Sequence, residues 1–93
     1  YTKNTKEIIS AFEKAITDKT KAISISHTVF ITGLIAPIKE LSELAHKHDI
    51  AVIVDSAHGI GMLDLNMKEL GCDVFCTSPY KWCGAPTGCC VLY

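Results

Sequence analysis

The sequence predicts an α/β fold in which helices cover a mostly parallel sheet. Helical and strand-like segments alternate along the 93 residues, and strand–helix–strand units imply parallel neighbours with right-handed crossovers. Residues 50–54 form an apolar, β-branched run, which is typical of a strand buried on both faces. The last two strands are joined without a helix, so we expect that pair to be antiparallel. We therefore expect three layers, α/β/α.

The first predicted helix starts at Asn4, because Glu7 follows three residues later in a pattern that resembles a capping box. Residues 17–20 end this helix, and residues 21–26 alternate into a strand. One face of the helix is apolar at helical spacing. Its positions are Ile8, Ile9, Phe12 and Ile16.

A loop over residues 27–36 is predicted next, with Gly33 as a break. Pro37 suits the first turn of the second helix, whose apolar positions include Ile38 and Leu41. His46 and His48 fall near the end of that helix, where the dipole favours positive charge. We expect both histidines to be solvated.

The third predicted helix is short. Asn66 and Glu69 repeat the capping pattern, and Gly71 closes the helix in the left-handed conformation. A strand over residues 73–77, a loop that carries Lys81, and a last strand over residues 89–93 complete the chain.

Lys81 lies in the stretch Thr77-Ser78-Pro79-Tyr80-Lys81-Trp82, where a strand gives way to a loop rich in Gly and Pro. An amine held at the end of a buried strand has its charged form disfavoured. A neutral amine is the nucleophile that forms a Schiff base. The alternative is a surface lysine whose stem lies along the protein while its charge stays in water.

Asp55 comes directly after the strand over residues 50–54, and Lys81 follows the next predicted strand, over residues 73–77. Ligands of open α/β sheets bind outside the carboxyl ends of the strands, so we expect both residues at one edge. A carboxylate that faces a pyridinium nitrogen and a lysine that forms a Schiff base are what a protein supplies to pyridoxal phosphate. The alternative for Asp55 is a helix-capping or loop aspartate.

Four motifs in order resemble the fold-type I, class V aminotransferase family, which includes cysteine desulfurases, kynureninases and isopenicillin N epimerase-like proteins. The resemblance covers nearly the whole chain. The motifs are His27 with Gly33 and Pro37-Ile-Lys-Glu-Leu41, Asp55-Ser-Ala-His58, Ser78-Pro-Tyr-Lys81-Trp82, and Ala85-Pro86-x-Gly88.

The resemblance implies a role for each of five residues. Lys81 would be the catalytic residue that holds pyridoxal 5'-phosphate as a Schiff base and later carries a proton. Asp55 would pair with the ring nitrogen, and His58 would contact the phenolic oxygen or the ring face. Ser78 and Tyr80 would donate hydrogen bonds to the phosphate.

This chain departs from the family pattern at several positions. His58 stands where cysteine desulfurases carry Gln, and Tyr80 stands where many members carry His, although kynureninases have Tyr there. Phe30 stands where several members carry an Asn near the cofactor oxygen, so that contact is not carried over. Cys89 and Cys90 replace a small pair, for which we have no account. We expect His27 to be structural and Trp82 to pack the lysine loop.

The implied function is a PLP-dependent enzyme that acts on an amino acid, as an epimerase or transaminase. The alternative within the family is a cysteine desulfurase-like or kynureninase-like lyase. The resemblance places the ring-stacking residue and the substrate-carboxylate arginine outside this chain, and it implies a cytoplasmic homodimer. A catalytically inactive module and a zinc-binding domain are the alternatives from other classes.

The composition of the chain argues against two classes of binding partner. The net charge of −1 and the pI near 6.4 argue against a nucleic-acid or anionic membrane surface. No apolar run reaches the roughly 18 residues of a transmembrane helix. The chain has no initiator Met and stops inside a predicted strand, so we expect residues 1–93 to be a fragment of a larger cofactor-binding domain. Three short helices cannot cover four strands, and both edges of the sheet would be unpaired. We therefore expect the fragment alone to be aggregated or molten, and so inactive.

Five cysteines in 93 residues raise the question of disulfides or zinc. Their number is odd, and no CxxC pair occurs. We expect buried free thiols, as in a reducing compartment, and no metal. A zinc site that uses His58 and several of the cysteines is the alternative.

Overall fold

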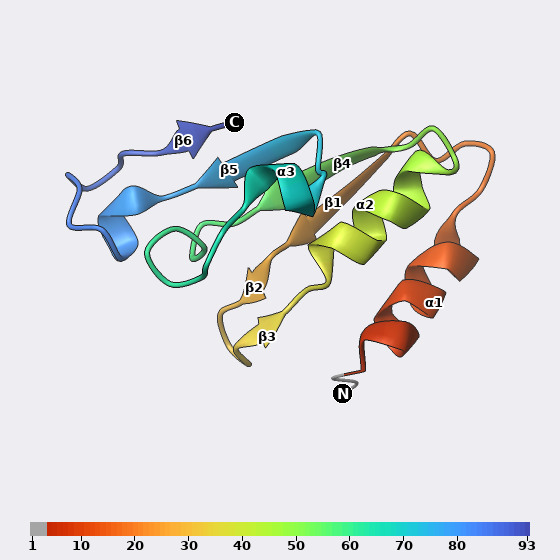
Figure 1. Cartoon of the computed structure of the whole chain (residues 1–93), viewed down its shortest axis with the longest axis horizontal. Coiled ribbons are helices and arrows are strands. Elements are labelled where there is room, and N and C mark those ends of the chain that lie inside the picture. Colours follow the sequence, from red (N-terminus) through yellow and green to blue (C-terminus); the bar gives the residue numbers. More distant parts are fainter. Residues whose placement is uncertain (1–3) are drawn as a thin grey trace.

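The computed structural model describes residues 4–93, which form a sheet with helices packed against it (Figure 1). The first half of the chain contains α1 (Thr5–Ala15), β1 (Ala22–Ser26), β2 (Thr28–Val29), β3 (Leu34–Ile35) and α2 (Ile38–His46). The second half contains β4 (Ala51–Asp55), α3 (Met67–Leu70), β5 (Val74–Thr77), a 3₁₀ turn (Pro79–Lys81) and β6 (Val91–Leu92).

The main sheet has the strand order β1-β4-β5-β6. β1 and β5 both pair with β4 in parallel, and β6 pairs with β5 antiparallel. The register sets Ser26 opposite Asp55, and Asp55 opposite Cys76. The predicted fold class, a mostly parallel α/β sheet with an antiparallel last strand, is therefore confirmed.

The core lies between this sheet and the helices. Val52 and Val54 of β4 are fully buried, and Ile38 and Ala45 of α2 belong to the same cluster. Phe75 of β5, which is 3% exposed, also belongs to the part of this core that the sheet contributes. Burial of such side chains contributes roughly 1.5–3 kcal/mol each relative to leaving them exposed.

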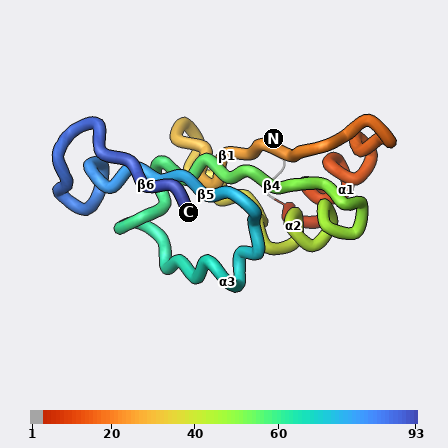
Figure 2. Tube along the Cα trace, turned by 90° about the horizontal axis from the view of Figure 1, so that it is seen from above, coloured from red at the N-terminus to blue at the C-terminus, as the bar shows by residue number. Residues whose placement is uncertain are grey.

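Only one face of β4 is covered by the described helices, so the expectation of burial on both faces is wrong for this chain. Ala51, Ile53 and Asp55 alternate with the buried valines and are exposed, and Ile53 retains 36% of its surface. The reason is topological. The crossovers β1-α2-β4 and β4-α3-β5 advance in the same direction along the sheet, so equal handedness sets α2 and α3 on the same side, as Figure 2 shows.

The predicted starts of α1 and α3 and the predicted end of α3 are confirmed, whereas α1 ends at Ala15, before the expected residues 17–20. Asn4 accepts the backbone N–H of Lys6 at 2.9 Å, and Asn66 accepts that of Lys68 at 3.2 Å. Asn66 also donates its side-chain amide to Glu69 at 2.8 Å. Gly71 ends α3 with φ 66°, a left-handed conformation that glycine adopts without steric cost.

Two segments differ from expectation. The segment 27–36, which was expected to be a loop, contains the antiparallel pair β2 and β3, closed by a turn in which Gly33 has φ 68°. Two-residue strands are too short to show alternation in a sequence. β6 covers only residues 91 and 92 of the expected 89–93, although the backbone of Tyr93 still exchanges hydrogen bonds with Phe75 at 2.9 and 2.8 Å.

The cysteines are free, but their burial was only partly predicted. Cys72 and Cys76 are half-buried, whereas Cys83, Cys89 and Cys90 are exposed. The expectation of buried thiols is wrong for these three, because they lie in the loop after the 3₁₀ turn and not in the sheet. No helix between residues 4 and 93 has the length and apolar character needed to cross a membrane.

Candidate active site

The carboxyl ends of β1 and β4 and the turn after β5 enclose a small cavity. Its volume is about 170 Å³, and it brings Asp55, His58 and Lys81 together. The remaining lining residues are Ser26, Thr28, Phe30 and Ala57. The two predicted strand-end groups, Asp55 and Lys81, therefore share one cavity with His58, three residues after Asp55.

Asp55 is the last residue of β4, and its side chain is exposed. Its Oδ1 accepts the backbone N–H of Ala57 at 3.0 Å, and its backbone carbonyl accepts the N–H of His27 at 2.8 Å. These bonds anchor the residue. Within residues 4–93, the second carboxylate oxygen accepts no hydrogen bond, so a positively charged or N–H-bearing ligand has an acceptor available at this edge.

Lys81 ends the 3₁₀ turn that Pro79 begins, and its backbone N–H bonds to the carbonyl of Ser78 at 3.1 Å. The side chain is half-buried, with Nζ 3.3 Å from His58 Nε2. The ring of Tyr80 lies 5.9 Å from the same nitrogen. The amine therefore points back toward the cavity and does not extend into solvent as a snorkelling lysine would.

His58 lies between two side chains of the lysine turn. Its Nε2 faces Lys81, and its Nδ1 accepts the indole N–H of Trp82 at 3.4 Å. The rings of His58 and Trp82 meet edge to face, with centroids 6.3 Å apart. Trp82 was expected only to pack the loop, and no sequence pattern indicates this contact, because it joins residues on two different loops.

Ser78 and Tyr80 flank the cavity without lining it. Ser78 precedes the 3₁₀ turn and is half-buried, with no capping hydrogen bond from its side chain. Tyr80 is 37% exposed. Ser78 and Tyr80 thus lie next to Lys81 along the chain, and both retain some exposed surface.

His27 lies in the core and away from the cavity lining. It is 4% exposed, and its Nδ1 lies 2.9 Å from Ser56 Oγ. Its ring meets Phe75 edge to face at 6.1 Å. Burial lowers the pKa of His27 below its ordinary value of 6.5, because a charged imidazole is poorly solvated there. These contacts support the structural role expected from the sequence.

A second hollow adjoins the first and is mostly apolar. It has a volume of about 410 Å³ and shares Thr28, Phe30 and His58 with the smaller cavity. Gly33, Ile35, Met62, Leu63 and Trp82 complete its lining. Sequence reasoning missed this hollow, since half of it is built by the short β2–β3 pair.

The donor set of the small cavity fits pyridoxal phosphate. A carboxylate for the ring nitrogen and an amine for the carbonyl carbon are the two groups that this cofactor requires of a protein, and Asp55 and Lys81 present them to one space. Thr28, which also lines the cavity, is 8% exposed, and its hydroxyl oxygen has no hydrogen-bond partner among the described residues. A buried hydroxyl without a partner is unusual, which favours a site built around a group beyond these residues.

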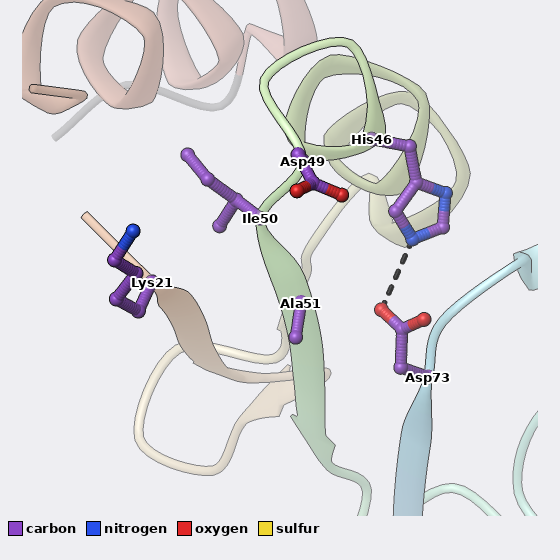
Figure 3. A pocket seen from close by; sticks show the side chains of 6 residues that line it. All are labelled: Lys21, His46, Asp49, Ile50, Ala51 and Asp73. Atoms are coloured by element: carbon purple, nitrogen blue, oxygen red, sulfur yellow. Dashed lines mark hydrogen bonds and ion pairs between the residues drawn. The ribbon is translucent and has the colours of Figure 1, made fainter. Parts of the chain in front are cut away.

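The opposite, amino edge of the sheet carries a larger hollow of about 460 Å³ (Figure 3). It is lined by Lys21, His46, Asp49, Ile50, Ala51 and Asp73. His46, at the end of α2, bonds to Asp73, at the start of β5, with 3.0 Å between Nε2 and Oδ2. His46 and His48 are both exposed, as expected, and the bond to Asp73 is a contact that the sequence did not indicate. Within residues 4–93, no three His, Cys, Asp or Glu side chains form a group that could hold a metal ion.

Known proteins resemble this chain in sequence. The model of the family described as aminotransferase class-V matches residues 2–93. A probable cysteine desulfurase from Halalkalibacterium halodurans is 42% identical over 85 residues, which is 91% of this chain and 21% of that protein. The isopenicillin N epimerase of Streptomyces clavuligerus is 43% identical over 82 residues, which is 88% of this chain and 21% of that protein.

Solved structures show the same fold. A structure described as SspA in complex with cysteine superposes with a TM-score of 0.84 at 29% identity, over 91% of this chain and 24% of that one. The cysteine desulfurase CsdA from Escherichia coli gives 0.84 at 25% identity, over 91% and 21%. The chain thus spans about a fifth of the length of the curated relatives it matches. The family match and these identities show that the chain belongs to the aminotransferase class-V family.

Proposed function

We propose that the protein containing this chain is a pyridoxal phosphate-dependent enzyme that acts on an amino acid, and that residues 1–93 belong to its large, cofactor-binding domain. The observation that carries this proposal is the single cavity lined by Asp55, His58 and Lys81 at the carboxyl edge of the sheet. Membership of the aminotransferase class-V family supports it. The complex of SspA with cysteine supports an amino acid as the substrate.

Each residue of the set has a distinct task. The cofactor supplies an electron sink for the charge that develops when a bond to the substrate's Cα breaks. Asp55 is anchored through Ala57, and its other carboxylate oxygen would pair with the ring nitrogen and keep it protonated. Lys81 would hold the cofactor through its amine and would be the base that moves the proton at Cα.

The remaining residues would position the cofactor and orient the amine of Lys81. His58 reaches Lys81 from the loop after β4 and would contact the cofactor beside it. Ser78 and Tyr80 donate their hydroxyls to the phosphate, a task for neutral donors next to an anion. Their place in the turn that carries Lys81 supports this assignment.

The cofactor assignment is tested by covalent trapping. The full-length protein is incubated with pyridoxal phosphate and reduced with borohydride, and the modified lysine is mapped by mass spectrometry. The label is expected on Lys81. Lys39 and Lys68 are exposed lysines on α2 and α3 and serve as internal controls. A label on either of these in place of Lys81 would contradict the assignment.

Two reaction classes remain within the proposal, and the relatives represent both. An epimerase or transaminase is the first, and the isopenicillin N epimerase supports it. A lyase of the cysteine desulfurase or kynureninase type is the second, and the cysteine desulfurases support that one. Release of sulfur from L-cysteine identifies a desulfurase, whereas exchange of the Cα hydrogen with solvent without release identifies an epimerase.

The assembly and location are proposed on the family resemblance. The full-length protein would be a cytoplasmic homodimer that binds neither nucleic acid nor membrane. Light scattering after size-exclusion chromatography tests the dimer, and a monomer that retains activity would contradict it.

A further inference from the structure

His58 is held at both ring nitrogens. Trp82 donates its indole N–H to Nδ1 at 3.4 Å, and Lys81 Nζ lies 3.3 Å from Nε2. The three side chains therefore form a chain of contacts that runs from the indole, through the imidazole, to the amine proposed to bind the cofactor.

The chemistry of the indole fixes the direction of this chain. An indole N–H is a donor only, so His58 Nδ1 must accept from Trp82. An imidazolium could not accept this bond, because both of its nitrogens are donors. In the neutral ring that accepts at Nδ1, the proton resides on Nε2.

The same reasoning extends to the lysine. His58 Nε2–H faces Lys81 Nζ, and an ammonium group has three donors and no acceptor. In this tautomer, a hydrogen bond between these two nitrogens therefore forms only when Lys81 is a neutral amine with a free lone pair. The neutral amine is the nucleophilic form.

We propose that Trp82 is a positioning residue that selects the Nε2–H tautomer of His58 and thereby favours the neutral amine of Lys81. The inference rests on the proposed function. With pyridoxal phosphate present, the neutral amine of Lys81 would be the nucleophile toward the cofactor's aldehyde carbon, and a C=N bond would replace the C=O bond as the oxygen and the two amine protons leave as water. An ammonium group has no electron pair with which to begin this step.

The backbone holds Trp82 in place for this role. Gly61, in the loop after His58, has φ 79°, and a Cβ there would lie 2.8 Å from Cys83 Sγ and 3.0 Å from Trp82 Cβ. Only a glycine allows the two loops to approach this closely. Cys83 N–H also bonds to the carbonyl of Pro79 at 2.8 Å, which closes the turn around Lys81 and Trp82.

Two other groups face the lysine and act in the opposite sense. Asp55 lines the same cavity, and the face of the Tyr80 ring lies 5.9 Å from Nζ. A carboxylate and an aromatic face both favour the ammonium form. Among the described contacts of Lys81, the bond to His58 is the one that favours the neutral amine. The tautomer of His58 therefore determines how strongly this bond favours the neutral form of Lys81.

Trp82→Phe tests the inference, because it keeps an aromatic ring and removes the N–H. His58 is then free to carry its proton on Nδ1 and to accept from a Lys81 ammonium. With full-length apoprotein and pyridoxal phosphate, the rate of borohydride-trappable attachment to Lys81 at about pH 7 should fall roughly three- to tenfold, the range that one hydrogen bond controls. At about pH 10, where a lysine ordinarily loses its proton without help, the difference should narrow.

Two further measurements separate this role from a merely structural one. Nitrogen NMR of the His58 ring in the unsubstituted apoprotein should show Nδ1 unprotonated and Nε2 protonated. In a His58→Leu background, Trp82→Phe should have no further effect on the rate, because its influence passes through His58. The NMR measurement does not depend on the folding of any variant.

The outcomes distinguish a failure of this inference from a failure of the proposed function. A proton on His58 Nδ1, or a Trp82→Phe rate equal to that of the unsubstituted protein at both pH values, would overturn the inference and leave the proposed function intact. Absence of cofactor on Lys81 in the unsubstituted protein would instead contradict the proposed function, and the tautomer measurement would still stand.

Discussion

Asp73 Oδ2 accepts the backbone N–H of Val52 at 2.7 Å and also bonds to His46 Nε2 at 3.0 Å. One carboxylate oxygen, just before β5, thus bonds to the second residue of β4 and to the last residue of α2; Figure 3 shows the bond to His46. The hydrogen bond from His46, followed by that from Val52, lowers the pKa of Asp73 below its ordinary value of 3.8.

The first prediction concerns acid stability and the variant Asp73→Asn. Because the folded pKa is lowered, the unfolded state binds more protons in the acid range, so the carboxylate stabilises the fold above about pH 4 and this contribution is lost as the pH falls through the folded pKa. The substitution keeps an oxygen for Val52 N–H and removes the charge. Since the pair is about half exposed, the effect is about 0.2–1 kcal/mol and is weakened by salt.

Thermal midpoints of both full-length proteins at neutral and acid pH measure this effect. The difference between them should be largest near neutral pH and should shrink as the pH falls. An equal difference at both pH values would show that the charge of Asp73 plays no part.

The second prediction concerns His27, whose pKa is lowered by burial. As the pH falls below 6.5, the unfolded chain takes up a proton that the folded His27 does not. Stability is therefore lost from that value downward, toward the folded pKa. His27→Gln removes the titration while an amide can still pair with Ser56. The unsubstituted protein should lose more stability than this variant in urea melts between about pH 7 and pH 5.5, and parallel curves would contradict the prediction.

The third prediction concerns Gly59, where a Cβ would overlap Ser56 Oγ. Ser56 is fully buried and bonds to His27, so it has no free space into which to move. Gly59→Ala should destabilise the protein by about 1–3 kcal/mol through overpacking. In a Ser56→Ala background the overlapping oxygen is gone, and the cost of Gly59→Ala should fall.

Gly84→Ala is the matched control for Gly59→Ala. A Cβ at Gly84 meets nothing within 4 Å, but the residue has φ 67°. Its substitution therefore reports left-handed backbone strain alone, roughly 1–2 kcal/mol, and should not depend on Ser56. Equal costs of Gly59→Ala with and without the Ser56 hydroxyl would contradict the proposed overlap.

The predictable part of the fold is the part that local chemistry determines. The caps at Asn4 and Asn66, the left-handed Gly71 and the strand that ends at Asp55 each depend on a few neighbouring residues, and each is found as expected. The burial of one face of β4 was not predictable. An apolar run such as that of β4 indicates a strand but not which layer covers each of its faces, and Ile53 is exposed for that reason.

The candidate site also has features that could be predicted from the sequence and features that could not. Asp55 and Lys81 could be placed at one edge because strand ends of a parallel sheet meet there, and the structure brings them into one cavity. The contact of Trp82 with His58 and the unpartnered hydroxyl of Thr28 could not be predicted. They depend on how two loops and a two-strand hairpin fold over that edge, and loop contacts carry no periodic signal in a sequence.

The last prediction tests the carboxylate of Asp55. Asp55→Asn preserves the size of the side chain and the oxygen that accepts Ala57 N–H, so the melting curve should change little. The variant removes the charge that, under the proposed function, would keep the cofactor's ring nitrogen protonated. Turnover of the full-length enzyme should therefore fall on the order of a hundredfold, which corresponds to about 3 kcal/mol of transition-state stabilisation. Asp64→Asn removes an equal charge from an exposed loop residue that lines neither of the two hollows at this edge, and it should leave turnover unchanged. Equal turnover in the two variants would show that the carboxylate of Asp55 does not act on the cofactor.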